Sequence, residues 1–166
     1  TDRIKESLFN VIQKYDMPEG RMVADVFSGV GSMGLEALSR GAKFVTFVDK
    51  DPKIVKKLER NISKAGFVKE SKVIRTNAFY SGAPVSEEKY ELVFVDPPFP
   101  TTRDVGDASK LAGLLKVLQG QIAPGALVIV RVHKAVELLD SYGYLKVIDR
   151  RKWGISAVTI LRYEIE

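Results

Sequence analysis

Short apolar runs that are typical of β-strands alternate with helix-like segments along the whole chain. Such alternation is typical of βαβ units, in which parallel strands form one sheet and helices cover both of its faces. The expected strands span residues 21–27, 44–48, 73–76, 90–96 and 126–132, and the expected helices span residues 2–15, 32–40, 51–66 and 107–119. Two further β-rich segments, 144–149 and 155–165, are expected to pair as a C-terminal antiparallel hairpin. The pattern therefore predicts an α/β fold with a seven-stranded, mostly parallel sheet.

The length and composition fit one folded domain. A chain of 166 residues buries about 70% of the surface that its unfolded form exposes. Hydrophobic residues make up 45% of the chain and charged residues 28%, which excludes disordered and collagen-like sequences. No internal repeat, long linker or block of charge marks a second domain. We therefore expect residues 1–166 to form one domain, on which an N-terminal helix within residues 1–20 packs.

Missing residue types exclude several kinds of chemistry. The chain has no cysteine, which excludes disulfides, thiolate metal sites and cysteine nucleophiles, and its one histidine leaves little for a histidine metal site or a Ser-His-Asp triad. No apolar run approaches the about 18–20 residues that span a bilayer, and the first residues are too charged for a signal peptide. We therefore expect a cytoplasmic protein without a bound metal or a membrane anchor. Because the sequence begins with Thr1, we also expect it to be part of a longer chain.

The chain has 26 basic and 21 acidic residues. The resulting net charge of +5 suits a polyanionic partner. The excess is uneven, because residues 50–75 contain nine basic residues against three acidic ones, and residues 143–153 contain four against one. Five basic residues recur at three- and four-residue spacing opposite an apolar stripe: Lys53, Lys56, Lys57, Arg60 and Lys64. We interpret them as the solvated face of an amphipathic helix.

A glycine-rich segment with the pattern G-x-G-x-x-G, residues 29–34, lies between an expected strand and an expected helix. Glycines let the backbone turn sharply and approach a ligand, and the helix N-terminus offers free N–H groups in the same space. Asp49 ends the next strand, 20 positions after Gly29, where a carboxylate can accept hydrogen bonds from both hydroxyls of a ribose. These features predict a nucleotide-like ligand, either NAD or S-adenosylmethionine.

Asp25, near the end of the first strand, separates these two ligands. A carboxylate just before the glycine turn would repel the pyrophosphate of NAD, whereas it suits the ammonium and sulfonium charges of S-adenosylmethionine. The sequence therefore favours S-adenosylmethionine as the cofactor, with S-adenosylhomocysteine as the product. An NAD-dependent oxidoreductase remains the alternative from another class of enzyme.

The sequence Asp96-Pro97-Pro98-Phe99 ends the expected strand at 90–96. Ligands of open α/β sheets bind beyond the carboxyl ends of the strands, so this tetrapeptide and the glycine turn are expected to face one crevice. Its prolines lack N–H donors, and the loop therefore presents carbonyl and carboxylate acceptors beside an aromatic ring. An exocyclic amine on a nucleobase fits both parts, because Asp96 and the Pro97 carbonyl can orient its N–H bonds while Phe99 stacks on the base. We predict that Asp96, Pro97, Pro98 and Phe99 are the catalytic residues.

Together these motifs resemble the Rossmann-like class I methyltransferases that modify exocyclic amines, whose motif is [ND]-P-P-[YFW]. More narrowly, three segments resemble the RsmD family, the bacterial 16S rRNA guanine-N2 methyltransferases: residues 1–10 (TDRIKESLFN), 34–42 (GLEALSRGA) and 93–99 (VFVDPPF). The resemblance covers nearly the whole chain. It implies transfer of a methyl group from S-adenosylmethionine to N2 of one guanine in 16S rRNA.

The resemblance also implies the partners and the binding residues. The substrate would be 16S rRNA, the small ribosomal subunit or its assembly intermediate, and we expect a monomer. Family members usually carry an N-terminal β-hairpin thought to contact RNA before the first of these segments; the sequence does not include it, so we expect weakened RNA binding. The cofactor residues would be Asp25, Phe27, Ser28, Gly29, Gly31, Gly34, Asp49, Lys50, Asn77 and Ala78.

Five basic residues are further candidates for contacts with RNA: Arg3, Lys5, Arg103, Arg151 and Lys152. His133 ends the strand at 126–132, and a lone histidine there is not assigned a catalytic role. Two alternatives stay open besides the oxidoreductase. One is an amine methyltransferase that acts on adenine N6 of DNA, on tRNA or on protein, and the other is a non-catalytic RNA-binding domain.

Overall fold

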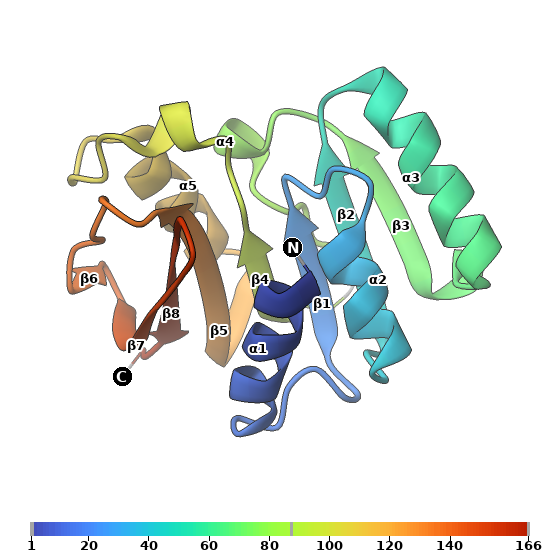
Figure 1. Cartoon of the computed structure of the whole chain (residues 1–166), viewed down its shortest axis with the longest axis horizontal. Helices are drawn as coiled ribbons and strands as arrows, with labels where there is room; N and C mark the ends of the chain where they lie inside the picture. Colours follow the sequence, from blue (N-terminus) through green and yellow to red (C-terminus); the bar gives the residue numbers. More distant parts are fainter. Residues whose placement is uncertain (1, 87, 166) are drawn as a thin grey trace.

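One mixed β-sheet runs through the computed structural model of the chain, which describes residues 2–86 and 88–165 (Figure 1). In these residues the sheet has eight strands in the order β3-β2-β1-β4-β5-β8-β7-β6. The strands from β3 to β5 in this order pair in parallel, and those from β5 to β6 pair antiparallel. The strands are β1 (Met22–Val26), β2 (Phe44–Asp49), β3 (Ser71–Arg75), β4 (Tyr90–Val95), β5 (Ile122–His133), β6 (Ser141–Tyr142), β7 (Leu145–Trp153) and β8 (Ser156–Tyr163).

Helices cover both faces of the sheet (Figure 1). Helices α1 (Asp2–Gln13), α2 (Ser32–Ser39) and α3 (Pro52–Ala65) pack on one face, and α4 (Ala78–Ser81) and α5 (Lys110–Gln119) pack on the other. Successive residues of a strand point to opposite faces of the sheet. Val23 therefore belongs to the hydrophobic core under α1, α2 and α3, and Ala24 belongs to the core under α4 and α5. Two short 3₁₀ turns, η1 (Val68–Glu70) and η2 (Phe99–Thr102), lie in the connections. No helix in the described residues combines the length and hydrophobicity that a membrane crossing requires.

The α/β fold predicted from the sequence is confirmed, but the strand count is eight rather than seven. The additional strand, β6, has two residues and is too short to show an alternating pattern. The sequence predicts a strand that begins at residue 126, whereas β5 begins at Ile122 and continues through Pro124-Gly125. The register with β4 shifts between Tyr90 and Leu92, so the dipeptide produces an irregularity at the start of the strand instead.

Gly34 brings α2 into close contact with the sheet. A Cβ atom at this position would lie 2.8 Å from Cζ of Phe47, a fully buried ring on β2. Replacing Gly34 by Ala must therefore push α2 away from β2. Such overpacking costs about 1–3 kcal/mol, and we expect the Gly34→Ala variant to have a melting temperature several degrees lower in thermal unfolding.

Gly113 provides the matched control, because it is exposed on α5 and a Cβ atom there would meet nothing within 4 Å. Gly113→Ala is expected to stabilise the protein by about 0.5–1 kcal/mol, since Ala restricts the unfolded chain more than Gly. Equal melting temperatures for the two variants would contradict the tight packing of α2 on β2.

Candidate functional site

The glycine-rich segment forms a tight turn between β1 and α2. Phe27 adopts a φ of 62°, unusual for a residue with a side chain, and Gly29 and Gly31 also have positive φ. The Ser28 N–H donates to the Val48 carbonyl at 3.0 Å, and the Gly31 N–H donates to the Ser28 carbonyl at 2.9 Å. The turn is thereby held beyond the carboxyl ends of β1 and β2, where the sequence predicts the cofactor.

Asp49 closes this turn from the neighbouring strand. Its Oδ2 accepts from the Gly29 N–H at 2.9 Å, and its Oδ1 accepts from the Asp51 N–H at 3.0 Å. A carboxylate oxygen can accept more than one hydrogen bond, so both oxygens remain able to bind hydroxyls of a ligand. The backbone bonds therefore orient the predicted ribose acceptor without using up its capacity.

Asp25 is a buried carboxylate on β1, with an exposed fraction of 2%. Burial raises the pKa of Asp25 to about 8; the hydrogen bond from the Gly34 N–H opposes the rise, and the charges of Asp96 and Asp49 add to it. No ion pair connects Asp25 to a Lys or Arg within residues 2–86 and 88–165. The ionised Asp25 carboxylate therefore has no positively charged partner in the described residues, and a cationic ligand could provide one.

Asp96 follows β4 and lies beside a residue that sequence analysis missed. Nη1 of Arg131, on β5, is 4.0 Å from Oδ2 of Asp96, and Nε of Arg131 donates to Oγ of the fully buried Ser156 at 2.9 Å. Burial raises the pKa of Asp96, and the charge of Arg131 lowers it. A signal for Arg131 existed in the sequence, because one charge interrupts an otherwise apolar strand.

The loop after Asp96 presents the acceptors that the sequence predicts. The Pro98 carbonyl accepts from the Thr101 N–H at 2.9 Å, whereas the Pro97 carbonyl receives no hydrogen bond from the part of the chain that the structure describes. The Phe99 ring packs edge to face on His133, with a centroid distance of 5.6 Å. Asp96 and the Pro97 carbonyl are therefore free to accept from a bound amine next to a positioned aromatic ring.

Two cavities meet at these side chains. The smaller, of about 220 Å³, is lined by Asp25, Ser28 and Lys5 among others, and the larger, of about 570 Å³, extends over Asp49 and Asn77 to the catalytic loop. Both cavities are lined by three of the same residues, Phe27, Asp96 and Arg131. One extended ligand can therefore reach from Asp25 to Asn77 while passing Asp96.

Asn77 and Phe79 form the far wall of the larger cavity. Oδ1 of Asn77 caps α4 by accepting from the Phe79 N–H at 3.0 Å, which leaves the side-chain NH₂ of Asn77 to donate to a ligand. The Phe79 ring contacts the Phe27 ring with a centroid distance of 4.8 Å. This end of the cavity offers flat apolar surface beside an amide, as a nucleobase requires.

Most of the predicted site residues line the two cavities: Lys5, Asp25, Phe27, Ser28, Gly29, Asp49, Lys50, Asn77, Ala78, Asp96, Pro97, Pro98 and Phe99. Gly31 and Gly34 do not line them. Their part is structural, because a side chain at Gly31 would meet Leu58 and the Gly34 N–H binds Asp25.

The predicted RNA-binding residues lie outside the cavities, apart from Lys5. Arg3 is exposed near the start of α1, and Arg103 borders a neighbouring cavity of about 390 Å³ that Phe99 and His133 also line. Arg151 and Lys152 lie near the β7–β8 turn. This turn is at the carboxyl end of β5, the same end of the sheet as the site. The Arg151 guanidinium binds both oxygens of Asp149 at 3.0 and 3.1 Å, so it is already paired.

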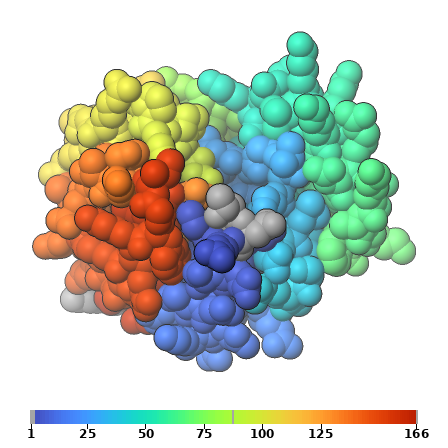
Figure 2. All heavy atoms as spheres, viewed as in Figure 1, coloured from blue at the N-terminus to red at the C-terminus, as the bar shows by residue number. Residues whose placement is uncertain are grey.

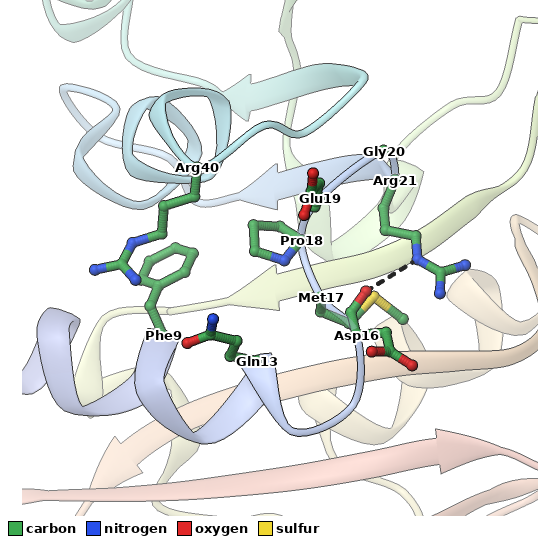
Figure 3. A pocket seen from close by; sticks show the side chains of 9 residues that line it. All are labelled: Phe9, Gln13, Asp16, Met17, Pro18, Glu19, Gly20, Arg21 and Arg40. Atoms are coloured by element: carbon green, nitrogen blue, oxygen red, sulfur yellow. Dashed lines mark hydrogen bonds between the residues drawn. The ribbon is translucent and has the colours of Figure 1, made fainter.

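A further cavity, of about 680 Å³, lies at the opposite end of β1 (Figure 3). Its two guanidinium groups are paired within the protein. Arg40 lies 4.9 Å from the Phe9 ring centroid and binds Glu36 at 2.8 Å, and Arg21 binds Glu91 at 2.8 Å. This cavity shares no lining residue with the site, and both of its guanidinium groups already have carboxylate partners. Among the described residues, no group of three or more histidine or carboxylate side chains is arranged to hold a metal ion.

The fold and the site together are those of the Rossmann-like methyltransferases, and comparison with known proteins identifies the family. Residues 1–162 match the family model described as "Conserved hypothetical protein 95". The chain belongs to this family, which is the RsmD family that the sequence motifs resemble.

Similar proteins agree with this assignment. The chain is 30% identical over 166 residues to YlbH of Bacillus subtilis, covering 98% of this chain and 85% of YlbH. It is 36% identical over 105 residues to Ribosomal RNA small subunit methyltransferase D of Escherichia coli, covering 60% of this chain and 48% of that protein. The chain thus spans about half the length of several relatives that it matches. An RNA methyltransferase from Salinibacter ruber, solved with S-adenosyl-L-homocysteine, has the same fold, with a TM-score of 0.71 at 18% identity and coverage of 98% of this chain and 93% of that chain.

Proposed function

We propose that the chain transfers a methyl group from S-adenosylmethionine to the exocyclic N2 amine of one guanine in 16S rRNA of the small ribosomal subunit. The observation that best supports S-adenosylmethionine as the cofactor is the buried carboxylate of Asp25. Asp96 and Asp49 both repel a charge on Asp25, and a ligand that brings a sulfonium and an ammonium charge relieves this repulsion. The pyrophosphate of NAD would increase it, which argues against an oxidoreductase.

The smaller cavity contains a second feature that suits a polar ligand. Oγ of Ser28 is buried and has no hydrogen-bond partner among the described residues. A buried hydroxyl without a partner is costly, and a carboxylate or amine of a ligand in this cavity would satisfy it. Together, Asp25 and Ser28 would hold the amino acid part of the cofactor, and Asp49 and Asn77 would hold its ribose and adenine.

The catalytic loop supplies acceptors for the substrate amine. Asp96 and the Pro97 carbonyl would accept its N–H bonds, Phe99 would stack on the base, and the amine lone pair would point toward the cofactor. S-adenosylmethionine supplies an already activated methyl group when bound. The N–CH₃ bond forms as the S–CH₃ bond breaks, its electron pair stays on sulfur, and the amine then loses a proton to Asp96 or water. Asp96 thus has two roles, orientation before transfer and proton acceptance after it.

The identity of the substrate base rests on family membership. The relatives named as methyltransferase D act, by their names, on RNA of the small ribosomal subunit, and an rRNA substrate implies a cytoplasmic protein. Guanine N2 follows from the resemblance of the three sequence segments. The loop itself fits any exocyclic amine on a base, so the base must be determined experimentally.

The test uses radiolabelled S-adenosylmethionine and small subunits that lack the modification. After incubation, the rRNA is digested and the labelled nucleoside is identified. The expected product is N2-methylguanosine at one position. Label in another nucleoside, in tRNA, in DNA or in a protein would contradict the proposed substrate, and absence of label despite cofactor binding would contradict methyl transfer to this subunit.

A further inference from the structure

The positive charge of the chain is concentrated in one segment. Residues 50–75 contain nine basic and three acidic residues, a net charge of +6. The rest of the chain contains 17 basic and 18 acidic residues, a net charge of −1. The entire excess of basic residues therefore belongs to α3 and the segments next to it. A general preference for basic residues would not produce this distribution.

Five of these residues form one exposed face of α3, which we call the α3 basic face: Lys53, Lys56, Lys57, Arg60 and Lys64. The opposite side of the helix is buried through Val55, Leu58 and Ile62. In residues 2–86 and 88–165, the side chains of the α3 basic face form no hydrogen bond or ion pair. Figure 2 shows α3, in teal, standing out from the surface of the molecule. These cations are therefore accessible to a partner.

The pattern of charges distinguishes this face from an ordinary solvated helix face. Solvated helices commonly place opposite charges four residues apart, whereas here Lys53–Lys57, Lys56–Arg60 and Arg60–Lys64 place like charges at this spacing. Such pairs destabilise a helix, and a polyanion bound to the face removes the repulsion. Lys72 and Arg75 are also exposed, but they lie on the edge strand β3. Charged residues on an edge strand prevent edge-to-edge pairing of sheets, so these two residues are not counted as part of a binding surface.

The α3 basic face begins at the candidate site. Lys50, Asp51 and Ile54 line the larger cavity together with the catalytic loop. From there α3 runs over 14 residues, which corresponds to roughly 21 Å at 1.5 Å per residue. A polyanion that places one group in the cavity can therefore lie along the helix.

We propose that the α3 basic face binds the phosphate backbone of the RNA that flanks the target nucleotide. This inference rests on the proposed function, because the catalytic loop in the cavity at the start of α3 suits an amine on a nucleobase and thus favours RNA over an acidic protein as the partner. Phosphate contacts of this kind position an RNA without reading its sequence. The α3 basic face would thus contribute to RNA affinity and leave the chemistry to the catalytic loop.

The test compares two variants with the same net charge. In one, Lys56, Lys57, Arg60 and Lys64 are all replaced by Gln. In the control, four exposed lysines elsewhere are replaced by Gln: Lys14, Lys89, Lys116 and Lys146. Binding to the small-subunit rRNA is measured at several salt concentrations, together with the affinity for S-adenosylmethionine and the kinetics of methyl transfer.

The α3 variant is expected to bind the rRNA at least about 100-fold more weakly near 0.1 M salt, with the slope of log K against log salt reduced by about 3. Its KM for RNA should rise in proportion, while kcat at saturating RNA and the cofactor affinity stay unchanged. The control variant should stay within about 3-fold of the unmodified chain, since it lacks the specific contacts. Equal losses in both variants, or none in the α3 variant, would overturn the inference even if the unmodified chain methylates the rRNA. Failure of the unmodified chain both to bind and to label RNA would instead overturn the proposed function, and this inference with it.

Discussion

An Asp25→Asn variant is expected to be more stable than the unmodified chain at pH 8 and to lose most of its affinity for S-adenosylmethionine. The pKa of Asp25 is about 8 in the folded protein and near the ordinary value of 3.8 in the unfolded chain. Between pH 4 and pH 8 the folded state therefore binds the proton that the unfolded state has released. Stability consequently falls as the pH rises through this range, because the unfolded state holds fewer protons.

Asn has nearly the same shape, can still accept from the Gly34 N–H, and has no proton to release. The Asp25→Asn variant should therefore exceed the unmodified chain in free energy of unfolding only slightly near pH 4 and by a few kcal/mol at pH 8, since one pKa unit corresponds to about 1.4 kcal/mol. Thermal unfolding at both pH values measures this difference. The exposed Asp107 gives the matched control, and Asp107→Asn should show no comparable dependence on pH.

The same substitution removes the partner of the cofactor cations. Loss of one member of a buried charge pair typically costs about 2–5 kcal/mol, which corresponds to a loss of affinity of about 30-fold or more. Calorimetry in buffers of different ionisation enthalpy should also show that S-adenosylmethionine displaces a proton from the unmodified protein at pH 7 and not from the variant. A variant with unchanged affinity and no added stability would show that Asp25 only supports the fold.

The position of the site was predictable because three strands bring it together. Asp25, Asp49 and Asp96 lie at or directly after the carboxyl ends of β1, β2 and β4, and β1 pairs in parallel with both of the others. The alternation of strands and helices predicts these parallel pairings, and the motifs then converge without any knowledge of side-chain packing.

Other parts of the site depend on tertiary packing that local patterns do not encode. Arg131 lies beside Asp96 because β4 and β5 pair in parallel with Val95 opposite Val130, and Ser156 on β8 accepts a hydrogen bond from its guanidinium. The high pKa of Asp25 depends on burial by residues distant in the sequence, and the availability of the Pro97 carbonyl depends on the fold of η2. The α3 basic face was visible in the sequence, but its lack of counter-charges required the structure.

The second large effect is expected at Asp96. Replacing it by Asn keeps the size of the side chain but puts an NH₂ donor where the substrate amine needs an acceptor. Loss of an oriented acceptor that also takes the proton should lower kcat by about 100-fold or more, whereas the affinity for S-adenosylmethionine should change only a few-fold. Single-turnover methyl transfer and cofactor binding, measured on the same preparation with Asp107→Asn as control, distinguish these two quantities. Near-normal turnover with Asn would exclude Asp96 from the reaction.

Arg131 then gives a test of how Asp96 acts. The nearby guanidinium lowers the pKa of Asp96, so an Arg131→Gln variant should have a higher pKa at this carboxyl. If the reaction needs the ionised form, the acidic limb of kcat/KM moves to higher pH in this variant, and activity at pH 8 is less affected than activity at pH 6. Equal losses at both pH values would mean that Arg131 contacts the RNA or the cofactor directly instead. A shifted limb would assign the proton acceptor to Asp96, because the Pro97 carbonyl does not titrate in this range and can only orient the amine.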